Sequence, residues 1–430
     1  MGTYSSPTLP VELWREVLLH VCSLPDEFDI SSTAYGETTH DRHKIYLHIW
    51  PKAMKQRLKV ALISKSFHTV ATEFLYSSFI IRCDSDYARV VEIVRCPETA
   101  RHLRRVTINR KISWLNFEEF CLCNKLCMYV DFTEFEFRND PEEWTSPPIM
   151  GPNLTYLEVS NIQTDSLDWE NMLEILPEYR SLRALRLTGV IEGDIDSALS
   201  DRQCILPQLE LLELTKDFDE ARTLLFTQWL PSLVLPKLNT LLLLNAGDLP
   251  GPALSAFGRT IYTLRINKCP LPMTPGEKIL LPKLRRLIVP YDFGDGVRWE
   301  RLPAVIQTEA IEVFEVYLAL FIRQFNGSFR EPWGPLLLTD LHTVLGLPSD
   351  PSITPNLKEV DLDLSLETYG AAGVGFQKGL TQWSKEMRGQ RPEVKLRTHF
   401  WEEDTEWTSI SLDCLITSQT GKRNRVAKVK

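Results

Sequence analysis

The sequence predicts an α/β solenoid, an irregular horseshoe of stacked strand-and-helix units, preceded by a small all-helical domain. Three observations lead to this prediction. Leucine makes up 62 of the 430 residues, an apolar pattern recurs along the chain at a nearly constant step, and the first 80 residues carry helical patterns instead. Self-similarity at a period of roughly 20 to 50 residues is the signature of stacked repeat architectures.

The repeating pattern is apolar-x-x-apolar-x-apolar. From Leu154 to Ile311 its copies are separated by 28, 27, 29, 23, 23 and 27 residues, with a mean near 26. Five copies share the entry Pro-x-Leu, which chance seldom repeats. The nine copies begin at Leu103, Leu154, Leu182, Leu209, Leu238, Ile261, Leu284, Ile311 and Leu357.

Each copy has the character of a strand followed by a helix. Its last two apolar residues usually flank a polar one, as in Leu185-Arg186-Leu187, which is the period-2 pattern of a strand with one buried face. Helix-like stretches lie between the copies, at 165–176, 220–230, 252–257 and 335–345. One unit is too small to bury its apolar face alone, so neighbours stack. A doubly wound parallel sheet is the alternative, and the 23- to 29-residue spacing favours the solenoid.

Leu-x-x-Leu-x-Leu at this period resembles the leucine-rich repeat family, over roughly residues 100 to 365. Regular members carry Asn or Cys three positions after the last Leu, and only Cys269 fits, so we expect an irregular convex side. The residue between the last two apolar positions should point to the inner curve, where it forms either a substrate-binding strip or a solvated face. These residues are Glu158, Arg186, Glu213, Leu242, Arg265, Ile288, Glu315 and Asp361, with Leu242 and Ile288 the better candidates for binding.

The N-terminal patterns predict three helices. Pro10 suits the first turn of a helix, and Leu13, Trp14, Val17 and Leu18 fall within an arc of about 140°. That arc is broad for a short surface helix and can serve two neighbours, one inside the domain and one outside. Two further apolar stripes follow, separated by the capping residues Ser64 and Ser66. They consist of Leu58, Ala61 and Leu62, and of Phe67, Val70, Ala71 and Phe74.

The segments Leu9-Pro-Val-Glu-Leu-Trp-Arg-Glu-Val-Leu, 58–68 and 71–76 together look like an F-box of the kind found in fungi. Two departures are Ile63, where the family has Val or Leu, and a polar insertion at 22–57 between the halves. The resemblance implies contact with a Skp-type adaptor, and a plain helical cap on the solenoid is the alternative. The adaptor-binding positions are Leu9, Pro10, Leu13, Trp14, Val17, Leu18, Leu58, Leu62, Ser64 and Phe67.

The resemblance implies a non-catalytic substrate-recognition subunit of a Skp-cullin-F-box type E3 ubiquitin ligase. Its partners would be the Skp-type adaptor, the cullin scaffold and a protein target. A leucine-rich-repeat interaction scaffold without a ligase is the alternative function. The expected domains are an F-box-like domain at 1–80, a repeat array at 81–400 and an acidic-then-basic tail at 401–430.

Composition narrows the function classes. A net charge of −9 and a pI near 5.6 argue against a general nucleic-acid binder, although residues 422–430 hold five Lys or Arg, as a solvated tail or a nuclear-import signal would. No apolar run approaches the length that crosses a membrane, and the first residues lack a secretory pattern. Nine irregularly spaced Cys suit reduced thiols in the cytoplasm or nucleus.

Signatures of chemistry are weak. Cys121-x-Cys-x-x-x-Cys127 lacks the second ligand pair of a structural zinc site, and His40 and His43 have no evident third ligand and are expected in a solvated loop. No Gly-x-Ser-x-Gly motif is present, and no Cys has a local His partner. We therefore expect no enzyme activity, no cofactor and no metal.

Overall fold

The computed structural model divides the chain into two compact units, residues 1–33 with 37–237, and residues 34–36 with 238–430. The residues that it describes are 10–22, 39–108, 123, 126–131, 153–164, 176–191, 203–216, 233–244, 254, 257–266, 279–291, 306, 309–318, 345–365 and 373–401. Among these, no helix is long and apolar enough to span a membrane.

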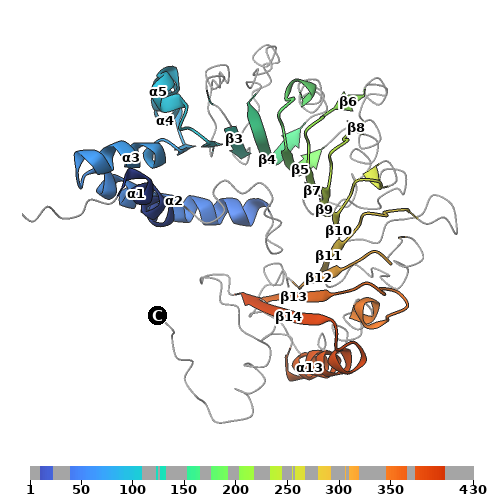
Figure 1. Cartoon of the computed structure of the whole chain (residues 1–430). Coiled ribbons are helices and arrows are strands. Elements are labelled where there is room, and N and C mark those ends of the chain that lie inside the picture. Colours follow the sequence, from blue (N-terminus) through green and yellow to red (C-terminus); the bar gives the residue numbers. More distant parts are fainter. Residues whose placement is uncertain are drawn as a thin grey trace, which may run out of the picture. The chain divides into compact units, whose positions relative to one another are not determined.

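The first unit joins five helices to a parallel sheet (Figure 1). The strands lie in the order β1-β2-β3-β4-β5-β7, and β6 pairs with β8 in a separate two-stranded sheet. The helices are α1 (Val11–Cys22), α2 (Thr39–Ala61), α3 (Lys65–Leu75), α4 (Asp84–Arg95) and α5 (Pro97–Ala100). The strands are β1 (Ser78–Ile81), β2 (Arg105–Ile108), β3 (Leu126–Asp131), β4 (Leu154–Thr164), β5 (Ala184–Ile191), β6 (Cys204–Ile205), β7 (Leu211–Lys216) and β8 (Leu233–Val234), and a 3₁₀ turn spans Leu176–Glu178.

The second unit also contains a sheet of parallel strands. Its parallel strands lie in the order β9 to β14, and α13 (Gly373–Gln390) precedes the last of them. The strands are β9 (Thr240–Leu244), β10 (Thr263–Ile266), β11 (Arg286–Tyr291), β12 (Val313–Leu318), β13 (Glu359–Ser365) and β14 (Lys395–Trp401).

The repeated apolar positions stack into rows, because neighbouring parallel strands are in register. The middle position forms one row in each unit, and every member is at most 3% exposed. The rows are Val106, Met128, Leu157, Leu185 and Leu212, and Leu241, Leu264, Leu287, Phe314 and Val360. This stacking buries the apolar face that a single unit cannot bury alone, and the predicted solenoid of leucine-rich-repeat type is confirmed.

The shared Pro-x-Leu entry is a turn that sets the start of each strand. The amide of Leu209 donates to the carbonyl of Leu206 at 3.3 Å, and the amide of Leu284 donates to that of Leu281 at 3.0 Å. In both turns the proline occupies the second position, where its fixed φ is favourable and no amide is needed. The turn brings the leucine inward, so Leu209 and Leu284 are fully buried.

All nine predicted copies form strands. The pattern missed β1, β3 and β14 of the parallel sheets and the two short strands β6 and β8. The predicted helices at 165–176, 220–230, 252–257 and 335–345 lie almost wholly outside the described residues.

One prediction was wrong. The insertion was expected to be a loop, but its residues 39–57 belong to α2, so His40 and His43 lie in a helix. The cause is tertiary packing, because Ile49, Trp50 and Ala53 pack against Ile80 of β1 and stabilise a helix that an isolated polar segment would not hold.

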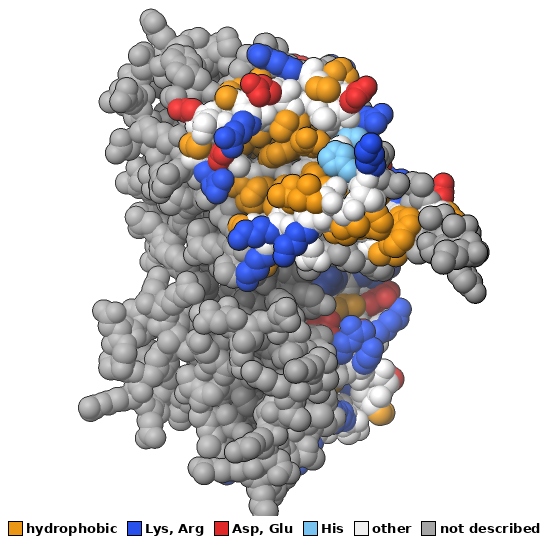
Figure 2. Space-filling model, turned by 90° about the vertical axis from the view of Figure 1, so that its left-hand side faces the viewer, with side chains coloured by type: hydrophobic (Ala, Val, Ile, Leu, Met, Phe, Trp, Pro, Cys, Tyr) orange, Lys and Arg blue, Asp and Glu red, His pale blue; other side chains and the backbone are white. Residues whose placement is uncertain are grey.

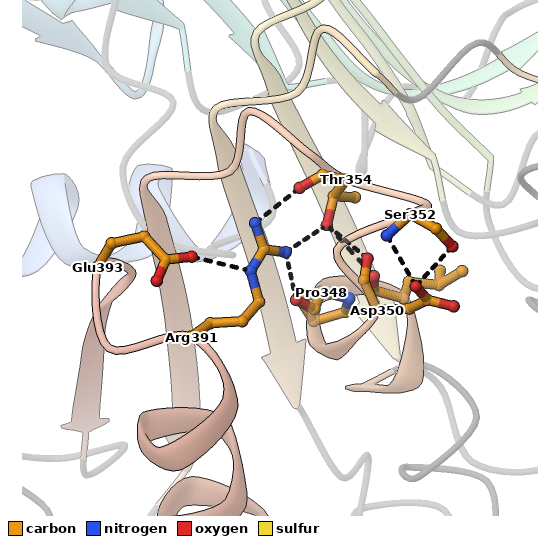
Figure 3. A network of polar contacts seen from close by, with 7 residues as sticks. Pro348, Asp350, Ser352, Thr354, Arg391 and Glu393 are labelled. Atoms are coloured by element: carbon orange, nitrogen blue, oxygen red, sulfur yellow. Dashed lines mark hydrogen bonds and ion pairs between the residues drawn. The ribbon is translucent and has the colours of Figure 1, made fainter.

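A buried arginine fastens the C-terminal end of the second unit (Figure 3). Arg391, which follows α13 and is 2% exposed, donates to the carbonyl of Pro348 at 2.9 Å. It also donates to the hydroxyl and the carbonyl of Thr354 at 2.9 and 2.8 Å. These bonds tie α13 to the turn that leads into β13.

Candidate functional site

The first helix divides its apolar side chains between two environments. Leu18 is 2% exposed and belongs to the core, whereas Leu13 and Val17 are 50% and 42% exposed. Between them, Trp14 stacks on Phe67 with ring centroids 4.6 Å apart. The broad arc of α1 therefore serves the domain on one side and solvent on the other, in the order that the helical angles predict.

The end of α2 and the turn that follows it extend the exposed apolar surface. Leu58, Leu62 and Ile63 are 53%, 75% and 64% exposed, at the end of α2 and in the turn that follows it. Ser64 caps α3, because its hydroxyl accepts a hydrogen bond from the amide of Phe67 at 3.2 Å. Ser64 thus ends the turn that carries Leu62 and Ile63 and starts α3 directly after them.

A shared core holds the three helices together. An ion pair of 2.8 Å between Arg15 and Glu73 adds a link between α1 and α3. The core consists of Leu18, Val60, Ala61, Val70, Ala71 and Phe74, with Phe67 and Leu75 packed against it.

We call the exposed residues Leu13, Val17, Leu58, Leu62 and Ile63 the apolar face. Among the described residues nine large apolar side chains are exposed, and these are five of them. Exposed cations lie on the same helices, including Lys59 and Lys65. Figure 2 shows hydrophobic side chains gathered on this end of the molecule, with Lys and Arg beside them. An apolar surface with a charged border is the pattern of a protein-binding site.

The structure brings most of the predicted adaptor-binding residues to this region. Pro10, Leu13, Val17, Leu58, Leu62 and Ser64 are exposed, Trp14 and Phe67 are half-buried, and Leu18 lies in the core. Leu9 lies outside the described residues. Sequence reasoning missed Ile63, which we treated as a departure from the family pattern. Its place between Leu62 and the cap Ser64 was the available signal.

The predicted substrate-binding row has a different environment from the one expected. Within each unit its members are in register, but seven of the eight are at most 5% exposed, and Asp361 is half-buried. The expectation of a solvent-exposed strip is therefore wrong. The buried members are Glu158, Arg186, Glu213, Leu242, Arg265, Ile288 and Glu315.

Contacts within the row explain much of this burial in the first unit. The hydroxyl of Tyr156 donates to Glu158, and Arg186 forms an ion pair with Glu213. The guanidinium of Arg186 also lies over the ring of Tyr156, 5.9 Å from its centroid. Register neighbours about 4.8 Å apart leave little room for water between such large side chains. In this row the opposite charges of Arg186 and Glu213 thus neutralise each other.

In the second unit the same row of strand residues contains two acidic side chains, Glu315 and Asp361, and Glu359 lies near them. Arg286 contacts Glu315 at 2.5 Å, and Arg397 contacts Glu359 at 2.6 Å. Burial raises the pKa of the Asp361 carboxyl to about 7, and the negative charges of Glu359 and Glu315 add to the effect. Asp361 is therefore protonated over much of the range in which an ordinary aspartate is charged.

The described thiols lie in two kinds of environment: Cys83 and Cys96 are exposed, and hydrogen bonds with Ser85 and Thr99 lower their pKa, whereas those of the Cys-rich segment are buried. Within the part of the chain that the structure describes, no three His, Cys, Asp or Glu side chains are grouped to hold a metal ion. Cys123 and Cys127 of the Cys-rich segment are buried, and burial raises the pKa of the Cys127 thiol. A buried thiol of raised pKa is a poor nucleophile and a poor ligand.

Comparison with known proteins gives one type of match. No family model matches the chain, and no curated protein does. Among solved structures, the chain is similar to the leucine-rich repeat-containing protein LegL7 from Legionella pneumophila, with 14% identity and a TM-score of 0.40. The match covers 81% of this chain and 99% of that one. The strand rows of the chain itself establish its leucine-rich-repeat type of fold.

Proposed function

We propose that the chain is a non-catalytic substrate-recognition subunit of a Skp-cullin-F-box type E3 ubiquitin ligase. The apolar face would bind a Skp-type adaptor, which in turn binds a cullin, and the repeat units would bind a protein target. Ubiquitin transfer would be the work of other subunits, in the cytoplasm or the nucleus. This assignment depends on the F-box resemblance of the N-terminal sequence.

The observation that carries the proposal is the exposure of Leu13, Val17, Leu58 and Leu62. These are positions that the F-box resemblance of the sequence assigns to the adaptor contact. Fully burying a side chain of this kind against a partner gains about 1.5–3 kcal/mol. A helical cap whose only role is to cover the repeats has no need of these side chains on its outer surface.

Charge adds a condition on the partner. Arg15, Lys59 and Lys65 are exposed on the helices that carry the apolar face. Complementary potentials speed association and exclude wrong partners. The partner is therefore expected to place acidic groups near Lys59 and Lys65, whereas α1 also exposes the acidic Glu12 and Glu16.

Co-precipitation with the Skp-type adaptor tests the proposal. The full-length chain should retain the adaptor, and a Leu13→Asp, Val17→Asp double variant should lose it by at least about 100-fold in affinity, because two charges would be buried in an apolar contact. The matched control is Ile205→Asp with Val234→Asp, an exposed apolar pair on β6 and β8 that are 49% and 37% exposed. This control should bind as the unmodified chain does.

Each outcome discriminates between the functions. If the unmodified chain retains no adaptor, the ligase assignment is wrong and the chain is better described as a leucine-rich-repeat interaction scaffold. If the double variant at α1 binds normally, the apolar face is not the contact.

Target recognition by the predicted row remains a proposal of smaller scope. Among the members of the row only Asp361 is partly exposed, and the exposed Arg397 of β14 lies beside it in register, so these two residues could offer charged groups to a target. Capture of targets by the adaptor-bound chain, compared with Arg397→Glu, would test this.

A further inference from the structure

The second helix has two faces with opposite surroundings. Ile49, Trp50 and Ala53 of α2 pack against Ile80 of β1, and Arg57, seven positions after Trp50, is completely buried. Leu58, one position later, is 53% exposed. The same helix therefore contacts the first strand on one side and presents the apolar face on the other.

Arg57 makes the densest contacts on the strand side. One guanidinium nitrogen, Nη1, donates to the carbonyl of Phe74 at 3.0 Å and to the hydroxyls of Ser77 and Ser78 at 3.3 and 3.2 Å. Trp50 adds a bond from its indole nitrogen to the Ser78 hydroxyl at 3.3 Å. Hydrogen bonds from a charged group are about twice as strong as neutral ones.

These contacts meet the chain where α3 ends and β1 begins. The Ser77 carbonyl accepts from the amides of Arg104 and Arg105, at 2.9 and 3.0 Å, and these residues lead into β2. The Ser77 hydroxyl donates to the Phe74 carbonyl at 2.8 Å. The guanidinium thus binds the short segment through which helices and parallel strands are joined, and it does so from a third element.

We infer that Arg57 is a positioning residue that fixes the apolar face relative to the first strands of the repeat array. Without it, α2 would keep its contacts with α1 and α3 through Val60 and Ala61, but its hold on Ser77 and Ser78 would be reduced to Trp50 and the packing on Ile80. The helices α1 to α3 would then take a range of orientations relative to β1. This inference goes beyond adaptor binding, because it holds for the chain alone.

The first test measures the orientation directly. A fluorescent donor at the exposed Lys55 of α2 and an acceptor at the exposed Ile205 of β6, both introduced as unnatural amino acids, report the distance distribution in the full-length chain. The unmodified chain should give one narrow distribution, and Arg57→Gln should broaden it. Gln56→Ala, a change at an exposed neighbour, is the matched control and should leave the distribution narrow.

The second test is amide hydrogen exchange. In Arg57→Gln, exchange should accelerate at least about tenfold in both 49–57 and 78–81, because bonds from a charged donor are lost at both segments. Residues 373–390 of α13 should be unchanged. Trp50→Phe, which removes only the indole donor, should give a smaller change at the same two segments and serves if the glutamine variant fails to fold.

The outcomes are decisive without any adaptor. Broadening together with paired acceleration supports the inference. An equally narrow distribution in Arg57→Gln overturns it, as does acceleration in α2 without acceleration in β1. Since neither measurement uses the adaptor, failure here is separate from failure of the ligase proposal.

Discussion

A buried arginine links helix to strand near each end of the described chain, but the helices at the two ends differ in how much apolar surface they expose. Arg57 joins α2 to the start of β1, and Arg391 joins α13 to the turn before β13. Both arginines are at most 2% exposed and donate to carbonyls and hydroxyls. Planar guanidinium groups suit such multiple bonding, and a lysine would not supply the same fork.

The difference lies in the outward surfaces. In α13, Leu380, Trp383 and Met387 are 1%, 4% and 1% exposed, so the apolar side chains that the structure describes in this helix are buried. The N-terminal helices instead leave the five residues of the apolar face in solvent. Capping a repeat array requires burial of the kind seen in α13. The apolar face therefore needs another explanation, and binding to a partner supplies one.

The largest expected contrast is between Trp383 and Leu62. Trp383→Ala should lower the free energy of unfolding by about 3–5 kcal/mol, because a buried ring and its bonds to Leu345 and Ser349 are lost. Leu62→Ala should change it by less than about 0.5 kcal/mol, because that side chain is 75% exposed.

Urea unfolding of the full chain, followed by circular dichroism, measures both values. A large loss of stability in Leu62→Ala would mean that this leucine stabilises the chain itself, and the comparison between the two ends would fail.

Much of this fold was predictable from the sequence because its signals are local. Leucine spacing identified nine strands, and Pro-x-Leu marked the turns that lead into several of them. The strand β3 was missed because Leu126, which pairs with Leu154, lies two residues before Met128, whereas the pattern requires three. The strand β14 was missed because Thr398 lies in register with Leu362, where the pattern requires an apolar residue.

Part of the candidate site was predictable from the sequence, and part depended on packing between distant segments. The breadth of the α1 arc was visible in the sequence, but Leu18 was assigned to the adaptor contact together with Leu13 and Val17, and it lies in the core. The helix over 39–57 depends on packing against Ile80, which no local pattern reports. Strand alternation likewise assigned Glu158 and Arg186 to one face, but it could not tell that this face is buried.

A smaller effect on stability, which depends on pH, is expected from Asp361 in the second unit. The raised pKa of Asp361, about 7, means that ionisation is unfavourable in the folded chain. Its contribution to stability is fully present below about pH 4 and is lost as the pH rises to about 7. Asp361→Asn should therefore gain stability above pH 7, by about 1–2 kcal/mol after solvent screening, and gain nothing near pH 4.

The matched control for this prediction has the opposite sign. The hydroxyl and amide of Ser352 lower the pKa of the Asp350 carboxyl, so Asp350→Asn should lose stability above pH 4 and lose progressively less as the pH falls. Melting temperatures between about pH 2 and pH 8 measure both variants, with the change in Asp350→Asn expected below about pH 4. A gain in Asp361→Asn that does not depend on pH would show that the carboxyl is not the cause.

The smallest expected effect sharpens the comparison from the C-terminal side. A Cβ added at Gly389, in the last turn of α13, would meet no atom within 4 Å. Gly389→Ala should therefore raise the stability of α13 by up to about 1 kcal/mol, because alanine loses less backbone entropy in a helix.

Gly258→Ala is the contrasting variant. Its added Cβ would clash with the Leu280 carbonyl oxygen, so this substitution should destabilise the chain. Hydrogen exchange in α13 measures the first change. If protection rises in α13 while adaptor binding stays constant, cap stability and partner binding are independent, as the difference between the two ends requires.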